Sequence, residues 1–477
     1  MRSRAKRSPG FTLVELMVSL VAGLVIAMAV VGLAKATTNT FHEEARMSVV
    51  ESSVRLGAER LRADLSRIGF MSTGNIVLAR DSNTAGTVPA HMRIATDTSI
   101  APPTGSRYNT TDDLAGLRIF VGGSGAAAGT FPGAGSGSQG PLALATVNGL
   151  NPDAIVITGN FTTSDLYQGT LYEAPDNLSG SCGSQSVLIK QNADAATRRL
   201  LNQPDPRVAL RSAFQPVPAT RFLARVVDPR GCEHYVVVCN VTMDASAACS
   251  LGDVCAAIHF EDPPRGGSPR LPVLPADPPA GSTIPKMVCG ANKGEPVSIN
   301  PVHRFRYYIG PNNDPLTALD PAGIENAGNK FNLYRDMLDA SNPPTPLPVT
   351  RQVMAEFAVD LKFGLTVSDP VPPNLKIFDM DSDLGGGAIT QWTQPPTFPT
   401  VNGGPGPQRV RTLRFRLATR SALPDRHGNL LMPAPAPYMV RYCTNPPDCA
   451  DPVRSRYARV RTIVSEVTLT NQLGMTY

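Results

Sequence analysis

The chain has 477 residues, of which 42% are hydrophobic and 17% are charged, so it can form a sizeable core and lacks the composition of a disordered protein. Its formal net charge is +5, but four of the 44 basic residues lie in the first seven positions, which leaves 40 basic against 39 acidic residues. This near-neutral balance excludes the basic footprint of a nucleic-acid-binding protein. With 45 prolines and 41 glycines, the chain is expected to be rich in β-strands, turns and long loops.

The N-terminal stretch is a basic cluster followed by a long apolar run. Four basic residues lie within Arg2–Arg7, and the 24 residues 11–34 contain one charge, Glu15. About 20 apolar residues suffice to cross a bilayer, and the basic flank predicts a cytoplasmic N-terminus with the rest of the chain facing outward. A cleaved secretory signal, with Ala34–Ala36 imitating its cleavage site, and a plain membrane anchor are simpler interpretations. However, the run exceeds the ~7–15 apolar residues of a signal, and neither interpretation explains a carboxylate that costs roughly 2.5–3.5 kcal/mol in the membrane.

The heptapeptide Gly10–Leu16, Gly-Phe-Thr-Leu-Val-Glu-Leu, together with its flanks resembles the class III signal of type IV prepilins. The resemblance implies cleavage between Gly10 and Phe11 by a prepilin peptidase and methylation of the new N-terminal Phe11. It also implies that Glu15 faces the N-terminal amine of a neighbouring subunit in a fibre. Two opposite charges that are each costly in a low-dielectric bundle become tolerable when they pair.

The helix is expected to continue beyond the apolar run. Apolar residues recur every three or four positions from Met47 to Ile68, which predicts one stripe that docks on a globular head, and Gly69 is a plausible C-cap. A helix from Phe11 to Ile68 would be a rod of about 90 Å.

The remainder reads as strands between turns and loop insertions. The last three predicted strands alternate in polarity, which is typical of half-buried antiparallel strands and of a sheet on which the helix can lie. The predicted strands are Leu117–Val121, Asp153–Gly159, Ser186–Lys190, Arg221–Val227, Tyr235–Val241, Ala256–Phe260, His303–Ile309, Phe331–Arg335, Met354–Leu365, Arg409–Arg420 and Tyr457–Thr470. The predicted insertions are Gly122–Gly140, Asp262–Pro285, Ser341–Pro348 and Gln394–Gln408.

These elements predict an α+β, pilin-like fold in which a long N-terminal α-helix packs on an antiparallel β-sheet head with long loop insertions. The expected parts are a leader peptide at 1–10, a transmembrane half-helix at 11–34, an amphipathic stalk helix at 35–70 and a periplasmic head at 71–477.

A second resemblance rests on short pieces in order along the chain, and it is to the large minor pilins of the PilW family. It implies a role in starting pilus assembly or at the pilus tip, with other minor pilins, the major pilin, the prepilin peptidase and the inner-membrane assembly platform as partners. It places the chain in the bacterial inner membrane as a single-pass protein, and in the pilus.

A minor pseudopilin of type II secretion and a pilus-tip adhesin are the alternatives. The pieces are Arg60–Phe70, Asp153–Ile157, Tyr307–Ile309, Asn332–Arg335, Arg409–Phe415 and Val467–Asn471.

Eight cysteines all follow the apolar run, on the side where disulfides persist. Cys443 and Cys449 bracket a turn-rich pentapeptide and are the expected pair. Cys232 and Cys239 are not expected to pair with each other, because a predicted strand separates them.

No enzymatic site and no cofactor are expected. The three carboxylates Asp379, Asp381 and Asp383 alternate as in a calcium loop, but the Gly and Glu of an EF-hand are missing at the required positions, so a solvated acidic turn is preferred. The six histidines form no short-range ligand motif, and no nucleophile or phosphate-loop signature is present. Trp392 is expected to serve in packing.

Overall fold

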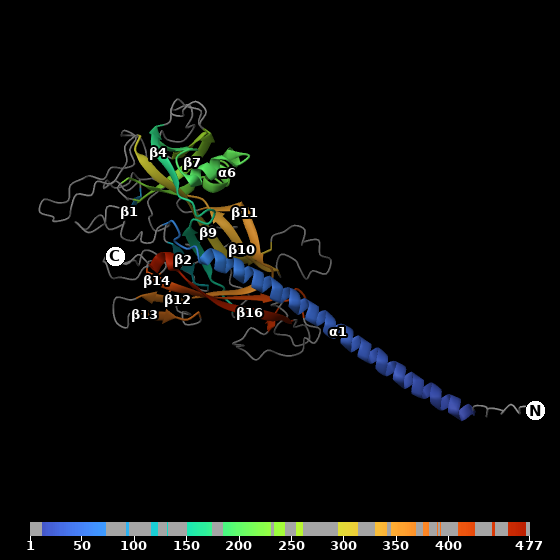
Figure 1. The fold of residues 1–477 in the computed structure, drawn as a ribbon. Coiled ribbons are helices and arrows are strands. Elements are labelled where there is room, and N and C mark those ends of the chain that lie inside the picture. The colour runs from blue at the N-terminus through green and yellow to red at the C-terminus, as the bar shows by residue number, and fades with distance from the viewer. Residues whose placement is uncertain are drawn as a thin grey trace, which may run out of the picture. The chain divides into compact units, whose positions relative to one another are not determined.

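The computed structural model describes residues 12–72, 92–94, 116–122, 131, 150–173, 185–229, 233–243, 254–260, 294–312, 330–340, 345–368, 375–380, 389, 392, 409–424, 441–443 and 457–473. They divide into two units, residues 1–52 and residues 53–477. The first unit contains most of one long helix, and the second contains the last turns of that helix and all the described strands (Figure 1).

The described elements confirm an α+β chain with a long N-terminal helix and large antiparallel sheets. The helices are α1 (Leu13–Leu65), α5 (Ala195–Leu201), α6 (Pro206–Phe214) and α8 (Thr470–Leu473). The strands are β1 (Met92–Ile94), β2 (Leu117–Phe120), β3 (Ala154–Gly159), β4 (Tyr167–Glu173), β5 (Gln185–Lys190), β6 (Phe222–Val227), β7 (Glu233–Met243), β8 (Cys255–Phe260), β9 (Pro296–Pro311), β10 (Phe331–Leu338), β11 (Pro346–Ala355), β12 (Ala358–Ser368), β13 (Leu375–Phe378), β14 (Val410–Arg420), β15 (Arg441–Cys443) and β16 (Tyr457–Thr468).

Helix α1 ends at Leu65, three residues before the predicted end at Ile68. The chain then tightens into a turn in which Ile68 N–H donates to the Leu65 carbonyl. Gly69 follows with φ at +71°, a left-handed conformation that glycine adopts without strain, and its N–H donates to Thr158 in β3 at 2.9 Å. The glycine therefore stops the helix and attaches its end to the sheet.

Six strands form a closed antiparallel barrel. Strand β9 pairs with β4 along one edge and with β6 along the other, and the ring is completed through β5, β8 and β7. Alternate residues fill the interior, and α5 and α6 add Leu201, Leu210 and Phe214 to that core. Closure pairs each of the six strands with a neighbour on both sides over part of its length, which is the usual remedy for edge-to-edge aggregation.

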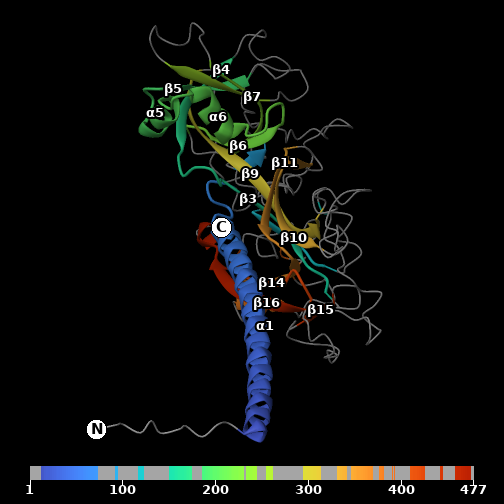
Figure 2. The same cartoon turned by 90° about the vertical axis from the view of Figure 1, so that its right-hand side faces the viewer.

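Strand β9 is shared by the barrel and by the sheet that receives the helix. Its first half lies in the barrel, whereas its second half, from His303 onward, pairs with β3 on one edge and β10 on the other. Strands β2 and β11 extend this second sheet. Figure 2 shows the result, with α5 and α6 near one end of β9 and with β3 and β10 along its other half.

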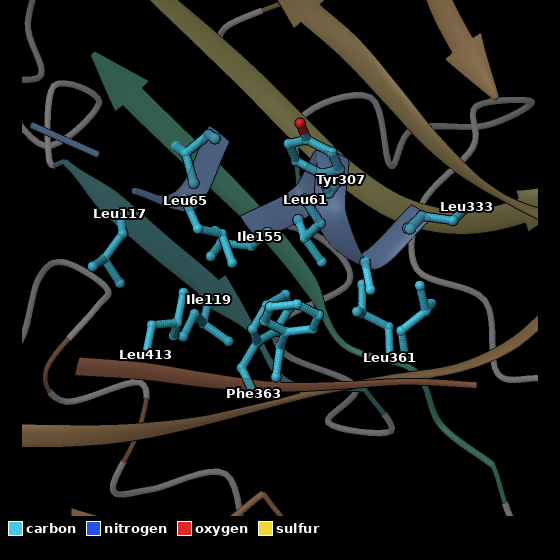
Figure 3. Packing of buried hydrophobic residues seen from close by; sticks show 14 of the residues in the cluster. Leu61, Leu65, Leu117, Ile119, Ile155, Tyr307, Leu333, Leu361, Phe363 and Leu413 are labelled. Carbon is cyan, nitrogen blue, oxygen red and sulfur yellow. The ribbon is translucent and has the colours of Figure 1, made fainter. Parts of the chain in front are cut away.

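A separate five-stranded sheet closes the core from the other side, in the order β13-β12-β14-β16-β15. Its inward residues and those of the β2-β3-β9-β10-β11 sheet share one apolar cluster with the end of α1. Leu61, Leu65 and Ile68 are fully buried in this cluster. Figure 3 shows Leu61 and Leu65 among side chains from both sheets. The prediction that the helix stripe docks on the C-terminal strands is confirmed for residues 54–68.

The prediction of a single strand over Met354–Leu365 is wrong. The segment divides into β11 and β12 at a turn containing Glu356 and Phe357, and Phe357 has φ at +52°. The alternation continues across the turn, so periodicity could not reveal it. The predicted Pro-rich interruption Ser341–Pro348 is also partly wrong, since β11 begins at Pro346. Pro at the start of an edge strand is acceptable because the outer edge needs no ladder hydrogen bond.

Gly57 tests how closely the helix approaches the sheets. A Cβ at this position would lie 2.8 Å from the Ala355 Cβ and 3.1 Å from the Met354 carbonyl oxygen. We expect Gly57→Leu to lower the free energy of unfolding by about 1–3 kcal/mol, because overpacking forces both partners apart. Urea unfolding of the full chain in detergent, followed by the fluorescence of Trp392, measures this. Ala63→Leu, on the exposed face of α1, is the matched control, and equal urea midpoints for the two variants would contradict the close approach.

Candidate functional site

The start of α1 is a capping box formed by Thr12 and Glu15. The Glu15 Oε2 accepts the Thr12 backbone N–H at 3.0 Å and the Thr12 hydroxyl at 2.9 Å, and the Thr12 Oγ1 accepts the Glu15 N–H at 3.2 Å. The Thr12 carbonyl accepts the first helical bond, from Leu16. This reciprocal pattern satisfies helix-start groups that would otherwise lack partners. The sequence signal was Thr-x-x-Glu before an apolar run, which the sequence analysis did not use.

The span that follows is apolar on every face. All side chains described from Leu13 to Ala34 are exposed, and α1 is long and apolar enough to cross a membrane. The polar side chains beyond it are satisfied within the helix, since Thr37, Thr38 and Thr40 each donate to the carbonyl four residues earlier at 2.8–3.0 Å. Glu15 is the single acid in this span. Gly10 and Phe11, the predicted processing pair, lie outside the described residues.

The end of α1 is held by a polar cluster formed by Asp64, Tyr307 and Arg335. The Asp64 Oδ2 accepts a hydrogen bond from the Tyr307 hydroxyl and another, at 2.7 Å, from the Arg335 Nε. The same Nε lies 3.0 Å from the Tyr307 hydroxyl oxygen, and the guanidinium stacks on the Phe305 ring at 3.5 Å from its centroid. Burial, reinforced by the Asp64 charge, raises the pKa of Tyr307 well above its usual range, so the hydroxyl remains a donor.

Two further contacts attach segments of the second resemblance to this part of the fold. The Asn471 side-chain amide donates to the carbonyls of Ser66 and Ile68 at 3.2 and 3.3 Å. Asn332 accepts the Phe357 N–H at 3.2 Å, at the turn between β11 and β12. Pieces of sequence more than 400 residues apart therefore meet around the end of one helix.

Asp153 joins the two sheets of the core. Its N–H donates to the Leu361 carbonyl at 2.7 Å, and its carboxylate accepts from the Gly122 N–H, the Phe363 N–H and the Lys362 ammonium at 2.9–3.1 Å. Burial raises the pKa of Asp153, against the opposing effect of Lys362. On the same strand as Lys362, Asp360 accepts from Arg416 at 3.0 Å, and burial raises the pKa of Asp360 to about 6.

Of the solvated acidic turn expected at Asp379, Asp381 and Asp383, the structure describes only Asp379. Asp379 forms an ion pair with Arg414 at 3.1 Å, and Asp381 and Asp383 lie outside the described residues. Among the residues that the structure describes, no group of His, Cys, Asp and Glu is arranged to hold a metal ion. Trp392 is 5% exposed and packs near Phe378 in the core, as predicted.

Three described cysteines, Cys239, Cys255 and Cys443, are disulfide-bonded. Cys449 and Cys232 lie outside the described residues, so the pairing of Cys443 with Cys449 and the separation of Cys232 from Cys239 stay predictions.

The helices α5 and α6 were missed by the sequence analysis. Each begins with an aspartate cap, Asp194 or Asp205, whose carboxylate accepts the N–H three residues later at 2.8 and 3.1 Å, and Pro206 occupies the first position of α6. An open cavity of about 510 Å³ lies beside them, lined by side chains that include Tyr167, Leu200 and Val208. Polar groups of Thr162 and Ser212 on its wall already bond within the chain.

Comparison with known proteins identifies the N-terminal segment. Residues 5–31 match the family described as the prokaryotic N-terminal methylation motif. This match supports a type IV pilin-like protein whose N-terminal segment is a substrate for prepilin peptidase and whose apolar helix suggests membrane anchoring. No curated protein and no solved structure matches the chain.

Removing the Asp64 charge tests the polar cluster at the end of α1. We expect Asp64→Asn and Tyr307→Phe each to lower the free energy of unfolding by about 1–3 kcal/mol, since the first removes the charge that pairs with Arg335 and the second removes the hydroxyl that donates to Asp64. A double-mutant cycle with urea unfolding should give a coupling energy of about 0.5–3 kcal/mol. The matched control is Glu59→Gln, an exposed acid on the same helix. Strict additivity of the two substitutions would show that the cluster is not cooperative.

His303 should make the head sensitive to acid. It is 1% exposed near the rings of Phe222 and Phe305, and burial lowers its pKa from 6.5 to about 4. Between these pH values the unfolded chain binds the proton more tightly than the folded chain, so this histidine makes stability fall as pH drops from about 6.5 to 4, by up to about 3 kcal/mol. Asp360 acts in the opposite direction, because its raised pKa favours the folded chain as pH falls below 6.

The measurement is the free energy of unfolding of wild type and His303→Phe at several pH values from 4 to 7. The difference between the two chains should vary with pH by up to the amount given above, because phenylalanine carries no proton. A pH-independent difference would mean that His303 is not buried as described.

Proposed function

We propose that the chain is a minor pilin of a type IV pilus system, similar to the PilW family, which is processed by prepilin peptidase and takes part in starting pilus assembly. The observation that carries the proposal is the methylation motif at residues 5–31, which overlaps an apolar span, residues 11–34, whose single acid is Glu15. Other minor pilins, the major pilin and the inner-membrane assembly platform are the proposed partners, and the chain is proposed to act without catalysis. Assembly would proceed by helix–helix packing within the bilayer.

The proposed location is the bacterial inner membrane, with one span and a periplasmic head, and the pilus after assembly. The basic cluster before the span supports a cytoplasmic N-terminus. The disulfide-bonded Cys239, Cys255 and Cys443 support an oxidising compartment for the head.

A minor pseudopilin of a type II secretion system would carry the same N-terminal signal. The motif alone therefore does not distinguish a type IV pilus subunit from a type II secretion subunit. The segments of the second resemblance favour the pilus. Several of them, around Asp64, Tyr307, Arg335 and Asn471, form the contacts that hold the end of α1. A pilus-tip adhesin is an alternative of a different class, in which the loops of the head would carry the binding. The cavity beside α5 and α6 is the described feature that supports this alternative.

N-terminal sequencing and intact mass of the membrane-extracted protein test the proposed class. We expect a mature chain that starts at Phe11 and carries one N-methyl group. A strain lacking prepilin peptidase is the control and should retain residues 1–10. A chain that starts near Thr37, past Ala34–Ala36, would identify a secretory signal and contradict the proposal.

A further inference from the structure

The open cavity beside α5 and α6 has the size of a ligand site, and the proposed function does not use it. Its volume of about 510 Å³ lies within the range of roughly 300–1,000 Å³ that small-ligand sites span. Leu200, Pro204 and Val208 contribute apolar surface to its wall, and Val208 is 61% exposed. A few polar groups interrupt this surface. Their hydrogen bonds determine which class of ligand the cavity suits.

The hydroxyl protons of Thr162 and Ser212 on the wall are already used within the chain. The Thr162 hydroxyl donates to the Asn160 Oδ1 at 3.3 Å. The Ser212 hydroxyl donates to the Ala209 carbonyl at 2.7 Å. A hydroxyl has one proton and two lone pairs, so these two groups offer a ligand acceptors and no donor.

The first turn of α6 also has little left to donate. Pro206 has no N–H, and the N–H groups of Val208 and Ala209 donate to the side chain and the carbonyl of Asp205, both at 3.1 Å. Arg207, the remaining residue of this turn, does not line the cavity. A helix start binds an anion through free N–H groups, and here the cap occupies them. The cavity is therefore poorly suited to an anionic ligand.

Asp205 adds a negative charge to the cavity wall. Its Oδ1 accepts the Val208 N–H, whereas no hydrogen bond to Oδ2 and no ion pair of this carboxylate is found among the described residues. Arg199, on the neighbouring helix, pairs with Asp165 at 2.5 Å instead. The cavity thus combines an apolar wall, hydroxyl lone pairs and one carboxylate without a cationic partner.

A protonated amine on an alkyl stem matches these features. An ammonium group has three donors, no acceptor and a positive charge, and the four-carbon stem of lysine packs along apolar surface. A guanidinium suits the wall less well, because it binds best to paired acceptors in one plane. The acceptors here are spread along the chain, since Thr162 precedes β4, Asp205 caps α6 and Ser212 lies in its last turn.

We propose that this cavity is a docking site for a lysine side chain of a partner protein. Asp205 receives the ammonium group, and Leu200 and Val208 contact the methylene stem. The wide opening favours a side chain that stays attached to a larger body, because sites for free small molecules enclose most of the ligand surface. This site goes beyond the proposed role in starting pilus assembly and does not depend on it.

A ligand-observed NMR titration of the full chain, kept in an uncharged detergent, tests the site with four probes. They are the N-acetyl methylamide of lysine, the same compound acetylated on its side-chain nitrogen, the corresponding arginine compound and 1,5-diaminopentane. Acetylation removes the charge. Asp205→Asn also removes the charge and keeps the cap, because asparagine is as good an N-cap as aspartate. Asp194→Asn, at the cap of α5 and away from the cavity wall, is the matched control.

We expect the lysine compound to bind with a Kd of about 1–10 mM, because Asp205 is exposed and water screens its charge. Asp205→Asn should weaken this binding by about fivefold, and Asp194→Asn should leave it unchanged. On the wild-type chain, the acetylated compound should bind about fivefold more weakly than the lysine compound. This last comparison needs no variant, so it does not depend on how a substitution affects folding.

Four results would overturn the assignment. Equal binding of the two lysine compounds would identify an apolar site without a role for charge. Tighter binding of the arginine compound, or binding of 1,5-diaminopentane more than about fivefold tighter than that of lysine, would assign the cavity to a guanidinium or to a free diamine. Unchanged binding by Asp205→Asn would remove the named acceptor. Absence of saturable binding would remove the site. N-terminal sequencing reports on processing at Phe11 separately, so none of these results affects the proposed function.

Discussion

One helix in this chain must satisfy two different solvents, and the burial of its last turns is the contact on which the head depends. Leu61, Leu65 and Ile68 are fully buried between two sheets that share no strand pairing. These side chains pack on the inner faces of both sheets, which also meet directly at Asp153. The first part of the same helix is instead apolar all round, as a membrane span must be. The apolar pattern along the helix changes from all faces to one face. This change therefore determines which part of the helix suits a membrane and which part packs on the sheets.

Strand β9 connects the contact at the end of α1 to the barrel. Strand β9 has 16 residues. Its first half is one strand of the barrel, and its second half is the central strand of the sheet that packs on the helix. Tyr307 and Phe305 on the second half touch the groups that hold Asp64, so the barrel and the helix end are linked through one continuous backbone.

Periodicity predicted those parts of the fold in which one face of an element is buried and the other is not. The stripe of α1 and the strands β6, β14 and β16 alternate in burial, and their bounds were predicted within a few residues. Periodicity failed where a turn keeps the alternation, as at Phe357 between β11 and β12. It also failed for α5, which has seven residues and too few turns to show a helical period.

At the candidate site, the charge of Glu15 was recognised from the sequence, but its bond to Thr12 was not. A charge in an apolar run was interpreted as a contact with another chain. The cap would have been recognised from the threonine three residues before the glutamate. The contacts of Asp64 with Tyr307 and Arg335 could not be predicted from spacing, because they join residues more than 240 positions apart.

The buried acids of the head show why Glu15 is different. Asp153 has Lys362, Asp336 has Arg306 and Arg351, and Asp360 has Arg416, each within 3.1 Å and each supplied by the same chain. A buried charge that lacks such a partner is strongly destabilising. In the head, each of these three acids is therefore paired with a cationic side chain of the same chain. Within the residues that the structure describes, Glu15 has hydrogen bonds only from the neutral Thr12. Neutral donors satisfy the oxygen that they contact but leave the negative charge uncompensated. Of these four acids, Glu15 is therefore the one whose charge no cation among the described residues compensates.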